Sequence, residues 1–380
     1  MKHIIVYFPY ELQENPKSGS GVRPKRIVEA FKKYCKEENL ELVLISGTTS
    51  ERQIKIDQYK ARGEYDKALF CYMENSTMPY WFTDPDRKPK NVKLDSRFWG
   101  VLKQHNIPIS LFYRDVYWQF DDMYVPPKGI KFLRYLMRQV YKKELKTYQK
   151  YVDLLYLPSL EMNKYVGWEG EVCELPPGME KVDRSTSTNI KLEKPFQAVF
   201  VGGISDQVGM LMLLEAFKVL NENEHRINLE LVCRENEYNK YEEMQKYEQY
   251  NWLTVSHLSG DELVQVYERS HIALIPREKN AYHDFAVPVK LFEYLSYGLP
   301  VVATDCDAQA RLLKEEGFGI VSNVDPIDYG KAILELLQPD HYYETKQAIE
   351  IKAWENHSWY ARVRKVADDM LRTKKGGANR

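Results

Sequence analysis

The sequence contains few cysteines, and their arrangement builds neither a disulfide framework nor a zinc site. There are five, an odd number, scattered along 380 residues without a Cys-x-x-Cys pair. Small secreted domains that depend on disulfides carry more cysteines at closer spacing. The composition therefore gives no support to a disulfide-stabilised module or a zinc ribbon, and it fits a reducing compartment such as the cytosol.

Long hydrophobic runs and an excess of charge of one sign are also missing. No run of about 18 apolar residues occurs, and the start, MKHIIVYFPY, is too short and too polar for a signal peptide. The 54 Lys and Arg balance the 55 Asp and Glu, for a net charge of −1. The sequence gives no argument for a nucleic-acid partner and predicts a cytoplasmic protein, soluble or peripheral to a membrane.

Two series of short apolar runs, separated by helical segments, make up most of the chain. The first half predicts strands at 4–8, 40–46, 68–72, 109–112, 154–157 and 172–175, and the second half at 198–201, 229–233, 253–256, 272–275, 301–304 and 319–321. This alternation is typical of doubly wound α/β domains, and 380 residues suffice for two. The polar, Ser/Thr-rich segment 181–195 predicts a linker between an N-terminal domain at 1–180 and a C-terminal domain at 196–360.

The most informative stretch is 271–305, which predicts a strand, a polar loop, a helix and a second strand. Pro288 is expected as the first helical residue and Gly298 as a left-handed cap at the helix end. Such a unit is a βαβ crossover between parallel strands. Ligands of parallel sheets bind beyond the carboxyl ends of the strands, so the loop 277–287 and the first helical turn are the predicted binding crevice.

The start of this helix suits a phosphorylated ligand. The N–H groups of Val289, Lys290 and Leu291 are expected to be unpaired there, and Lys290 adds a positive charge. Glu293, one turn later, can accept hydrogen bonds from a sugar or ribose diol. On helix position alone, an ion pair between Lys290 and Glu293 on a solvated helix face explains these two residues equally well.

The series Pro288-Val-Lys290-Leu-Phe-Glu293-Tyr-Leu, with Gly298-Leu-Pro-Val-Val after it, resembles the nucleotide-sugar signature of GT-B fold glycosyltransferases of family 4, the glycosyl transferases group 1. The resemblance implies two Rossmann-like domains that face a cleft, with the C-terminal helix, 361–380 here, packed back on the first domain. It also implies that the helix N-terminus holds the diphosphate of the donor and that Glu293 holds its ribose.

The implied activity is hexosyl transfer from a nucleotide diphosphate sugar to an acceptor hydroxyl, with retention of configuration and without a metal ion. The nucleotide sugar is then a substrate rather than a cofactor, and its type, UDP or GDP, stays open. The resemblance also suggests a glycan or polyprenyl-linked acceptor, and a role in polysaccharide or cell-envelope glycan synthesis. The two Asp-x-Asp triplets, Asp84-Pro-Asp86 and Asp305-Cys-Asp307, are too short a pattern to indicate a metal site.

Gly202 and Gly203 begin a turn that resembles the glycine turn of the family's donor domain, and here the sequence departs from the family. Gly203 and Val208 stand where an Arg and a Lys usually bind the diphosphate. Other cations are therefore candidates to supply the charge. The candidates for donor binding besides the two glycines and the helix start are Arg277, Lys279 and, near the base, Arg234.

The first Glu of the family's Glu-x7-Glu pattern is also missing, because Phe285 stands at its position. The nearest polar side chains, His283 and Asp284, are candidates for contact with the donor sugar and for catalysis. Asp115 is the catalytic candidate from the first domain. For His283 the alternative is a loop histidine without a chemical role, and for Asp115 it is a local ion pair with Arg114.

Three arginines and one glycine near the carboxyl ends of the first domain's strands are candidates for acceptor binding. Gly19-Ser20-Gly21 is expected as a pliable turn that leads into a basic helix start, and Arg114 follows the strand 109–112. The candidates are Gly21, Arg23, Arg26 and Arg114.

Segment 128–150 carries eight Lys or Arg against a single Glu, with apolar residues at every third or fourth position. This pattern predicts a basic amphipathic helix. It either lies on an anionic membrane surface, which would suit a polyprenyl-linked acceptor, or covers the sheet with its lysines in water.

Two other functions stay open. A non-catalytic GT-B subunit that binds a glycan or a partner glycosyltransferase would tolerate the missing Arg, Lys and Glu, whereas the intact Lys290 and Glu293 favour an enzyme. A nucleotide-sugar epimerase of the same fold would need acid and base carboxylates around the sugar, which the sequence does not identify.

Overall fold

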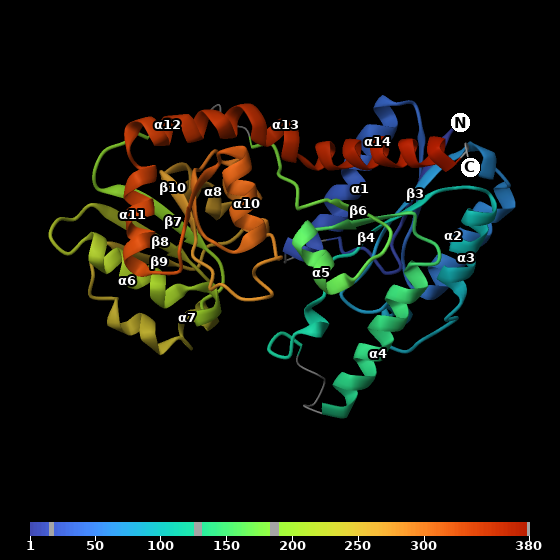
Figure 1. Cartoon of the computed structure of the whole chain (residues 1–380), viewed down its shortest axis with the longest axis horizontal. Coiled ribbons are helices and arrows are strands. Elements are labelled where there is room, and N and C mark those ends of the chain that lie inside the picture. The colour runs from blue at the N-terminus through green and yellow to red at the C-terminus, as the bar shows by residue number, and fades with distance from the viewer. Residues whose placement is uncertain (15–18, 125–130, 183–189, 378–380) are drawn as a thin grey trace. The chain divides into compact units, whose positions relative to one another are not determined.

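The computed structural model describes residues 1–14, 19–124, 131–182 and 190–377, and it divides into two compact units (Figure 1). Unit 1 comprises Met1–Pro176 together with Trp359–Arg380, and unit 2 comprises Pro177–Ser358. The chain thus leaves unit 1 after Pro176 and returns to it at Trp359, so the last helix belongs to unit 1. Among the described helices, none is both long and apolar enough to cross a lipid bilayer.

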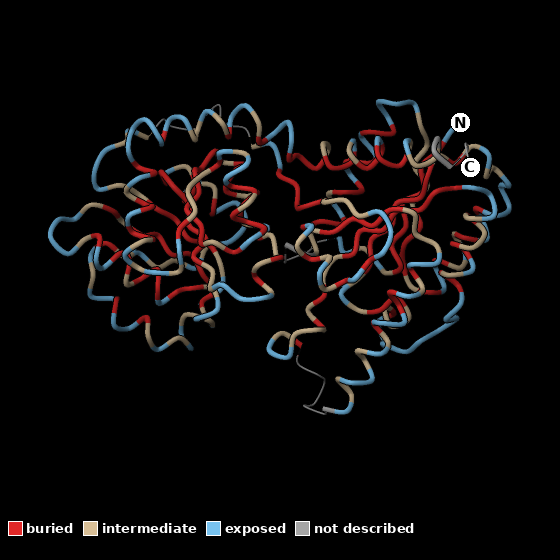
Figure 2. Tube along the Cα trace, in the orientation of Figure 1, coloured by how far each residue is buried: buried red, intermediate tan, exposed pale blue. Residues whose placement is uncertain are grey.

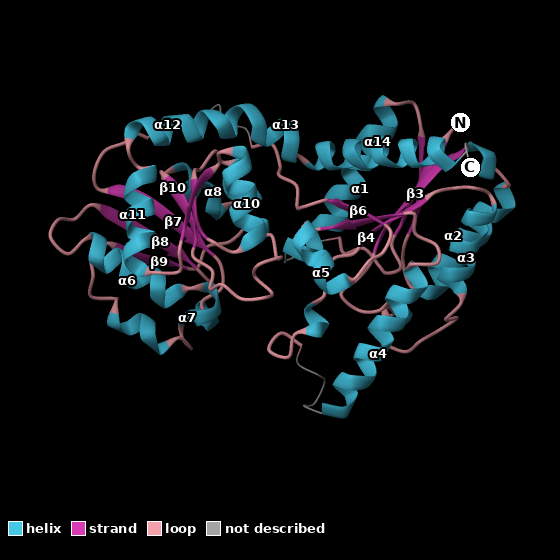
Figure 3. Ribbon diagram, in the orientation of Figure 1, coloured by secondary structure: helices cyan, strands magenta, loops and turns pink. Residues whose placement is uncertain are grey.

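Unit 1 is built on six parallel strands in the order β2-β1-β3-β4-β5-β6, with helices on both faces of the sheet (Figure 3). The strands are β1 (His3–Tyr7), β2 (Glu41–Ile45), β3 (Ala68–Glu74), β4 (Ile109–Phe112), β5 (Leu154–Leu157) and β6 (Glu171–Glu174). The main helices are α1 (Gly19–Glu37), α2 (Thr49–Arg62), α3 (Leu94–Gln104), α4 (Lys131–Tyr148), α5 (Asn163–Val166) and α14 (Trp359–Gly377). A hydrophobic core joins α1 and α14 to one face of this sheet.

Unit 2 repeats the plan with six parallel strands in the order β12-β11-β10-β7-β8-β9. The strands are β7 (Phe196–Val201), β8 (Ile227–Val232), β9 (Leu253–Ser256), β10 (Ile272–Ile275), β11 (Val301–Thr304) and β12 (Gly319–Ser322). The helices are α6 (Met210–Leu220), α7 (Glu235–Tyr238), α8 (Glu262–Glu268), α9 (Val289–Ser296), α10 (Asp307–Glu316), α11 (Pro326–Leu336), α12 (Pro339–Ala348) and α13 (Trp354–His357). One core packs α6 and α11 against Leu274, and a second packs α9 and α10 against Ala273.

All twelve predicted strands form, and those at 109–112, 154–157, 253–256, 272–275 and 301–304 match to the residue. Strands of a parallel sheet with helices on both faces are buried on both sides, so they are continuous apolar runs and stand out in the sequence. Figure 2 shows this burial as red strands at the centre of each unit. The predicted α/β fold with two doubly wound sheets is confirmed.

Two helix starts differ from the prediction. Helix α1 begins at Gly19, so Gly21 lies inside the helix rather than in a turn before it. Helix α9 begins at Val289, and Pro288 is its N-cap, with extended backbone angles of φ −70° and ψ 130°. Local residue preferences locate a helix end only to within a few residues, because packing around the end also decides where the helix begins.

The strand order of unit 2 creates a topological switch point between β7 and β10. From β7 the chain continues to β8 on one side and later to β10 on the other. Two loops touch there: Gly209 has φ 73°, and a Cβ atom at this position would lie 1.6 Å from the carbonyl oxygen of Pro276. Only glycine fits such a contact. The loops after β7 and β10 therefore meet at the carboxyl edge, where ligands of doubly wound sheets bind.

Candidate functional site

The loops after β7 and β10, together with the start of α9, form the candidate donor site in unit 2. The N–H of Glu278 donates to the carbonyl oxygen of Gln207 (3.2 Å), which joins the two loops. The hydroxyl of Tyr294 on α9 accepts a hydrogen bond from the N–H of Val201 at the end of β7 (2.9 Å). Gly298, at φ 69°, ends the helix in the predicted left-handed conformation. These bonds hold the helix beside the two loops.

The first N–H groups of α9 belong to Val289 and Lys290. The third candidate, Leu291, donates its N–H to the carbonyl oxygen of Pro288 (3.1 Å), so the expectation that this group is unpaired is wrong. Helix ends commonly tighten in this way, because an i to i+3 bond satisfies a group that the regular helix leaves without a partner. An anion at this helix start would be bound by two N–H groups and the helix dipole.

Lys290 and Glu293 form an ion pair, with 2.7 Å between Nζ and Oε2. The second oxygen of Glu293 accepts a hydrogen bond from the hydroxyl of Tyr267 on α8 (2.7 Å), and that hydroxyl lies 3.4 Å from Nζ of Lys290. The side chains of Lys290 and Glu293 are 34% and 33% exposed, so both can be reached from solvent. The ion pair that the sequence left as an alternative is therefore present, and it lies within a triad open to a ligand.

Tyr267 is a member of this triad that sequence reasoning missed. It lies 26 residues before Glu293, and no local pattern connects the two positions. Its side chain is buried, and burial raises its pKa, so the hydroxyl stays protonated and keeps its role as a donor to Glu293.

Arg277 follows the contact between Pro276 and Gly209 and carries a charge that no carboxylate offsets. Its guanidinium donates from Nη1 to the carbonyl oxygen of Ala286 (2.9 Å). Among the described residues, no Asp or Glu forms an ion pair with it, and burial lowers its pKa. A partly buried guanidinium without a carboxylate favours a bound anion, and its planar array of donors suits phosphate oxygens.

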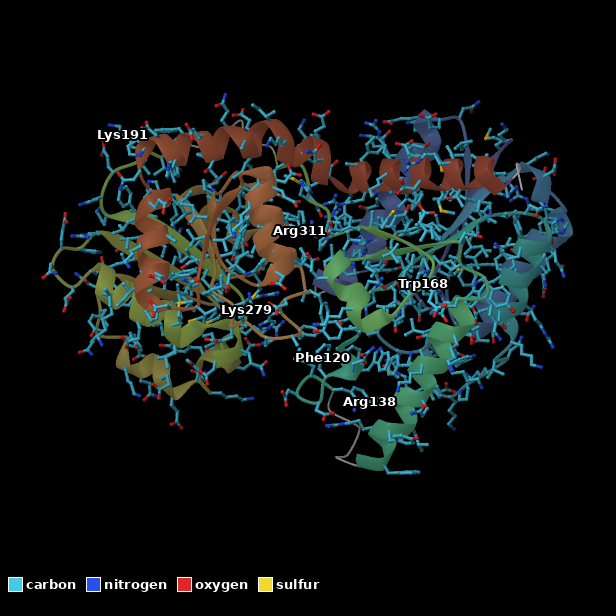
Figure 4. The ribbon with its side chains drawn as sticks, in the orientation of Figure 1. Phe120, Arg138, Trp168, Lys191, Lys279 and Arg311 are labelled. Carbon is cyan, nitrogen blue, oxygen red and sulfur yellow. The ribbon has the colours of Figure 1, made fainter. Side chains whose placement is uncertain are left out.

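The other candidate cations of the donor site have carboxylate partners. Lys279, labelled in Figure 4 on the loop after β10, lies 3.2 Å from Asp305 and 3.3 Å from Asp307. Arg234, after β8, lies 2.9 Å from Glu237 and its side chain is 74% exposed. The charges of Lys279 and Arg234 are therefore already balanced within the protein.

The glycine turn after β7 holds a carboxylate that the sequence did not reveal. The N–H of Ile204 donates to Oε2 of Glu237 (3.3 Å), and a Cβ at Gly203 would lie 3.1 Å from that oxygen. The N–H of Gly202, by contrast, donates to the carbonyl oxygen of Val232 (3.0 Å) and extends the sheet. The turn thus binds a negatively charged oxygen through its backbone, as a phosphate oxygen would be bound.

His283 lies buried in the loop between β10 and α9, with Nδ1 2.7 Å from the carbonyl oxygen of Glu278. Nδ1 also lies 3.1 Å from the amide nitrogen of Asn280, which only donates. The contact with the carbonyl oxygen is the shorter of the two and favours the tautomer with the proton on Nδ1, which leaves the lone pair on Nε2. Burial lowers the pKa of His283, which keeps the ring neutral near pH 7. This imidazole can accept a hydrogen bond from a hydroxyl group and can take up a proton.

Asp284 and Phe285 follow in the same loop. Oδ1 of Asp284 is buried without a hydrogen-bond partner, and burial, followed by the charge of Asp307, raises the pKa of this carboxyl group. Phe285 is buried against Tyr282, with 5.1 Å between ring centroids. The position of the missing Glu therefore belongs to the core, and Asp284 is the neighbouring carboxyl group with an unsatisfied oxygen.

In unit 1, Arg23 and Arg114 converge on Glu74, another residue that sequence reasoning missed. Nε of Arg23 lies 3.0 Å from one carboxylate oxygen, and Nη2 of Arg114 lies 3.5 Å from the other. Glu74 is the last residue of β3 and is fully buried. Two guanidinium groups thus share one carboxylate at the carboxyl edge of the sheet.

The remaining candidates of unit 1 make local contacts. Arg26 lies 3.0 Å from Glu29, one turn later on α1, and Gly21 lies in the same helix. Asp115 follows β4 and accepts a hydrogen bond from the N–H of Tyr117 (2.9 Å). This bond closes a turn, which fixes the Asp115 carboxylate beyond the end of the strand.

Both Asp-x-Asp triplets make polar contacts within their own unit. Asp84 accepts hydrogen bonds from the N–H (2.8 Å) and hydroxyl (3.0 Å) of Thr49, and Asp305 binds Lys279. Over the described parts of the chain, three or more His, Cys, Asp or Glu side chains do not gather in a group that could hold a metal ion.

Comparisons with known proteins agree with this geometry. Residues 195–339, which include the loops after β7 and β10 and all of α9, match the model of the family described as glycosyl transferases group 1. No curated protein matches the chain in sequence.

Solved structures with this fold include several glycosyltransferases. A glycosyltransferase from Rickettsia africae superposes with a TM-score of 0.60 at 13% identity, over 97% of this chain and 99% of that one. A trehalose-6-phosphate structure from E. coli, bound with UDP-2-fluoro glucose, gives 0.58 at 11%, over 98% and 99%. WaaG, a glycosyltransferase involved in lipopolysaccharide biosynthesis, gives 0.54 at 15%, over 96% and 99%.

These matches confirm the resemblance and the expectation of a glycosyltransferase. Residues 195–339 belong to the glycosyl transferases group 1, and the chain that contains them has the GT-B fold.

Proposed function

We propose that this protein transfers a hexosyl group from a nucleotide diphosphate sugar to a hydroxyl group of a glycan or lipid-linked acceptor, with retention of configuration and without a metal ion. The observation that carries the proposal is Arg277, a partly buried guanidinium without a carboxylate partner among the described residues, at the switch point of unit 2. A diphosphate is the ligand that such a charge and the adjacent start of α9 would bind together.

In this proposal the donor spans the site from the diphosphate to the ribose. Arg277 and the N–H groups of Val289 and Lys290 hold the diphosphate. Lys290 turns from its ion pair toward the phosphate oxygens, while Tyr267 continues to hold Glu293, whose free oxygen then accepts from the ribose diol. The charge of Arg277 is already in place, so no reorganisation of this group is needed when the leaving diphosphate develops negative charge.

The sugar lies toward His283 and Asp284 in this proposal. Nε2 of His283 and the unsatisfied oxygen of Asp284 accept hydrogen bonds from sugar hydroxyl groups. The bond between the anomeric carbon and the diphosphate oxygen breaks with its electron pair on the diphosphate. The acceptor oxygen bonds to the same face of that carbon, and its proton passes to the departing oxygen.

Unit 1 supplies the acceptor side in this proposal. Arg23 and Arg114 place two guanidinium groups beside Glu74 at the end of β3, and Asp115 places a carboxylate at the end of β4. Of the structures similar in fold, one has UDP-2-fluoro glucose bound and another is involved in lipopolysaccharide biosynthesis. UDP-sugars are therefore the first donors to test, and a cell-envelope glycan is the first acceptor class.

A second candidate, a non-catalytic subunit of the same fold, is favoured by the glycine turn. Gly203 and Val208 provide no cation there, and the carboxylate of Glu237 occupies an N–H of the turn. A diphosphate oxygen at this place would have to displace that carboxylate from the N–H of Ile204. The two candidates differ in whether the protein binds a nucleotide sugar at all.

Calorimetric titration of UDP-, GDP-, ADP- and dTDP-sugars into the full chain tests the proposal. We expect selective binding of one nucleotide, weakened by Arg277→Gln at least about tenfold, because a hydrogen bond to a charged group contributes about 1.5–3 kcal/mol. Glu293→Ala should also weaken binding, whereas Arg226→Gln and Glu315→Ala, on other parts of unit 2, should leave it unchanged. Absence of binding by the folded wild type would reject the enzyme in favour of the non-catalytic subunit.

A further inference from the structure

Helix α4 presents one continuous exposed face with apolar residues at one end and lysines at the other. It is shorter than the predicted helix 128–150, of which 128–130 lie outside the described residues. Positions three, four or seven apart share a side of a helix, and this spacing groups the exposed residues of α4 and the turn after it on one side. They are Phe132, Tyr135, Leu136, Gln139, Lys142, Lys143, Lys146, Gln149 and Lys150. Figure 2 shows the start of α4 mostly in tan and pale blue, without the continuous burial of the central strands.

The apolar end of this face is unusually open. Phe132 is 68% exposed, Tyr135 is 61% exposed and Leu136 is 43% exposed. Single exposed apolar side chains are ordinary, but three that adjoin on one helix face point to a contact with another surface.

The opposite side anchors the helix, so the exposed face cannot turn inward. Tyr141, Glu144, Leu145 and Tyr148 are buried there. The carboxyl group of Glu144 accepts hydrogen bonds from the N–H of Tyr80 (2.9 Å) and the hydroxyl of Tyr148 (3.1 Å).

A second anchor lies on the flank of α4. Arg138, labelled in Figure 4, donates to the carbonyl oxygens of Trp118 (2.8 Å) and Gln119 (3.0 Å). It also pairs with Asp121, as Arg134 does. Two of the helix's cations are thus used within unit 1, and they are not part of the exposed face.

The lysines of the exposed face have no carboxylate partner in the described structure, where Lys143 alone among them meets an aromatic ring, with Nζ 5.8 Å from the centre of the Trp81 ring. Within the described residues, no carboxylate forms an ion pair with Lys142, Lys143, Lys146 or Lys150. The one acidic residue of α4, Glu144, is fully buried on the other side. The face therefore has four positive charges and no negative charge.

We propose that this exposed face of α4 docks on an anionic lipid bilayer, with Phe132, Tyr135 and Leu136 in the headgroup region and the four lysines on lipid phosphates. An amphipathic helix that lies in the interface needs an apolar surface to insert and cations to meet anionic lipids, and α4 has both in sequence along one face. The inference deepens the proposed function, on which it rests for the acceptor: a lipid-linked acceptor would be met at the membrane.

Other occupants fit this face less well. A second copy of the chain would bring eight lysines of these two faces into one interface, and the faces supply no carboxylate to balance them. Nucleic acid would use the lysines but leave the apolar end in water, and the net charge of the chain is −1. A bilayer satisfies both ends of the face at once.

Flotation of the full chain with vesicles tests the proposal. We expect binding to vesicles of phosphatidylglycerol and phosphatidylcholine, and little binding to phosphatidylcholine alone. Lys142→Gln, Lys143→Gln, Lys146→Gln and Lys150→Gln in one chain should lower the partition coefficient at least about tenfold, because each lysine near the surface contributes about fivefold. Raising the salt concentration should weaken wild-type binding in the same direction.

Matched variants separate this face from general charge and hydrophobicity. Lys32→Gln, Lys33→Gln, Lys36→Gln and Lys60→Gln in one chain remove four exposed lysines of α1 and α2. Phe132→Ser, Tyr135→Ser and Leu136→Ser should abolish insertion, whereas Ile54→Ser, Val92→Ser and Leu160→Ser, at exposed apolar positions elsewhere in unit 1, should not. If the control sets lose as much binding as the α4 sets, the proposal is wrong.

Further measurements on the same proteins distinguish membrane docking from self-association and from a defect in donor binding. A folded wild type that does not bind anionic vesicles overturns the proposal, and self-association that the α4 variants abolish would then assign the face to a second copy. Nucleotide-sugar binding by the α4 variants should equal that of the wild type, because the donor site lies in unit 2. If the wild type binds the donor but not vesicles, this inference alone is wrong. If it binds vesicles but not the donor, the proposed function alone is wrong.

Discussion

Glu144 is a fully buried carboxyl group in unit 1, and its ionisation is expected to make the stability of that unit depend on pH. Its two hydrogen-bond donors, the N–H of Tyr80 and the hydroxyl of Tyr148, both reach Oε1, while Oε2 is buried without a partner. Burial raises the pKa of Glu144 from 4.5 to about 8, against the smaller opposing effect of these bonds. The carboxyl group is therefore mostly protonated in the folded protein at pH 7.

The sign of the effect follows from proton binding. Between pH 4.5 and about 8 the folded state holds a proton on Glu144 that the unfolded state has lost, so the free energy of unfolding falls as pH rises through this window. One pKa unit corresponds to about 1.4 kcal/mol, which makes the full effect of the order of a few kcal/mol. Above about pH 8 no further loss from this group is expected.

Glu144→Gln tests this reasoning. The amide oxygen keeps the acceptor for both donors, and the amide nitrogen, like the hydroxyl of the protonated acid, leaves a donor near the position of Oε2 without a partner. The variant should therefore match the wild type near pH 5 and be more stable by a few kcal/mol near pH 9.

Urea unfolding of unit 1, followed by tryptophan fluorescence at pH 5, 7 and 9, measures the difference. Glu29→Gln, at an exposed position on α1, is the control and should leave the wild-type pH profile unchanged. Parallel pH profiles for the wild type and Glu144→Gln would refute the assignment of a raised pKa to this group.

Two further predictions concern unit 2. Gly209→Ala should destabilise it by several kcal/mol, because the new methyl group would overlap a carbonyl oxygen, whereas Gly260→Ala, with φ 59° and open space around it, should cost only roughly 1–2 kcal/mol in thermal or urea unfolding. Equal costs would contradict the close approach of the two loops. Tyr267→Phe should weaken nucleotide-sugar binding roughly tenfold in calorimetry, because Glu293 loses the donor that orients it. Tyr343→Phe, at an exposed position, is its control, and an unchanged affinity in Tyr267→Phe would exclude Tyr267 from the site.

The strands and the helix cap of the donor site could be predicted because each depends on neighbouring residues. Buried parallel strands require continuous apolar runs, and all twelve are visible as such. Gly298 could be predicted because a left-handed helix cap favours glycine. The motif around Lys290 and Glu293 could be predicted for the same reason, because it is a short stretch with helical spacing between two neighbouring strands.

Residues that act through distant partners could not be found in this way. Tyr267 meets Glu293 across 26 positions, and Glu237 meets the glycine turn across 33. Glu74 lies 51 positions from Arg23. No periodicity links such pairs, because strand order and loop contacts bring them together.

By itself, therefore, the sequence determined where the strands lie, that they form two doubly wound sheets, and which helix start has the spacing of a donor site. Only the tertiary structure decided which charges are balanced: Lys279 has two carboxylates and Arg277 has none. It also decided that the lysines of α4 share one open face. Charge pairing depends on distances across the fold, and sequence spacing gives such distances only within a single helix or strand.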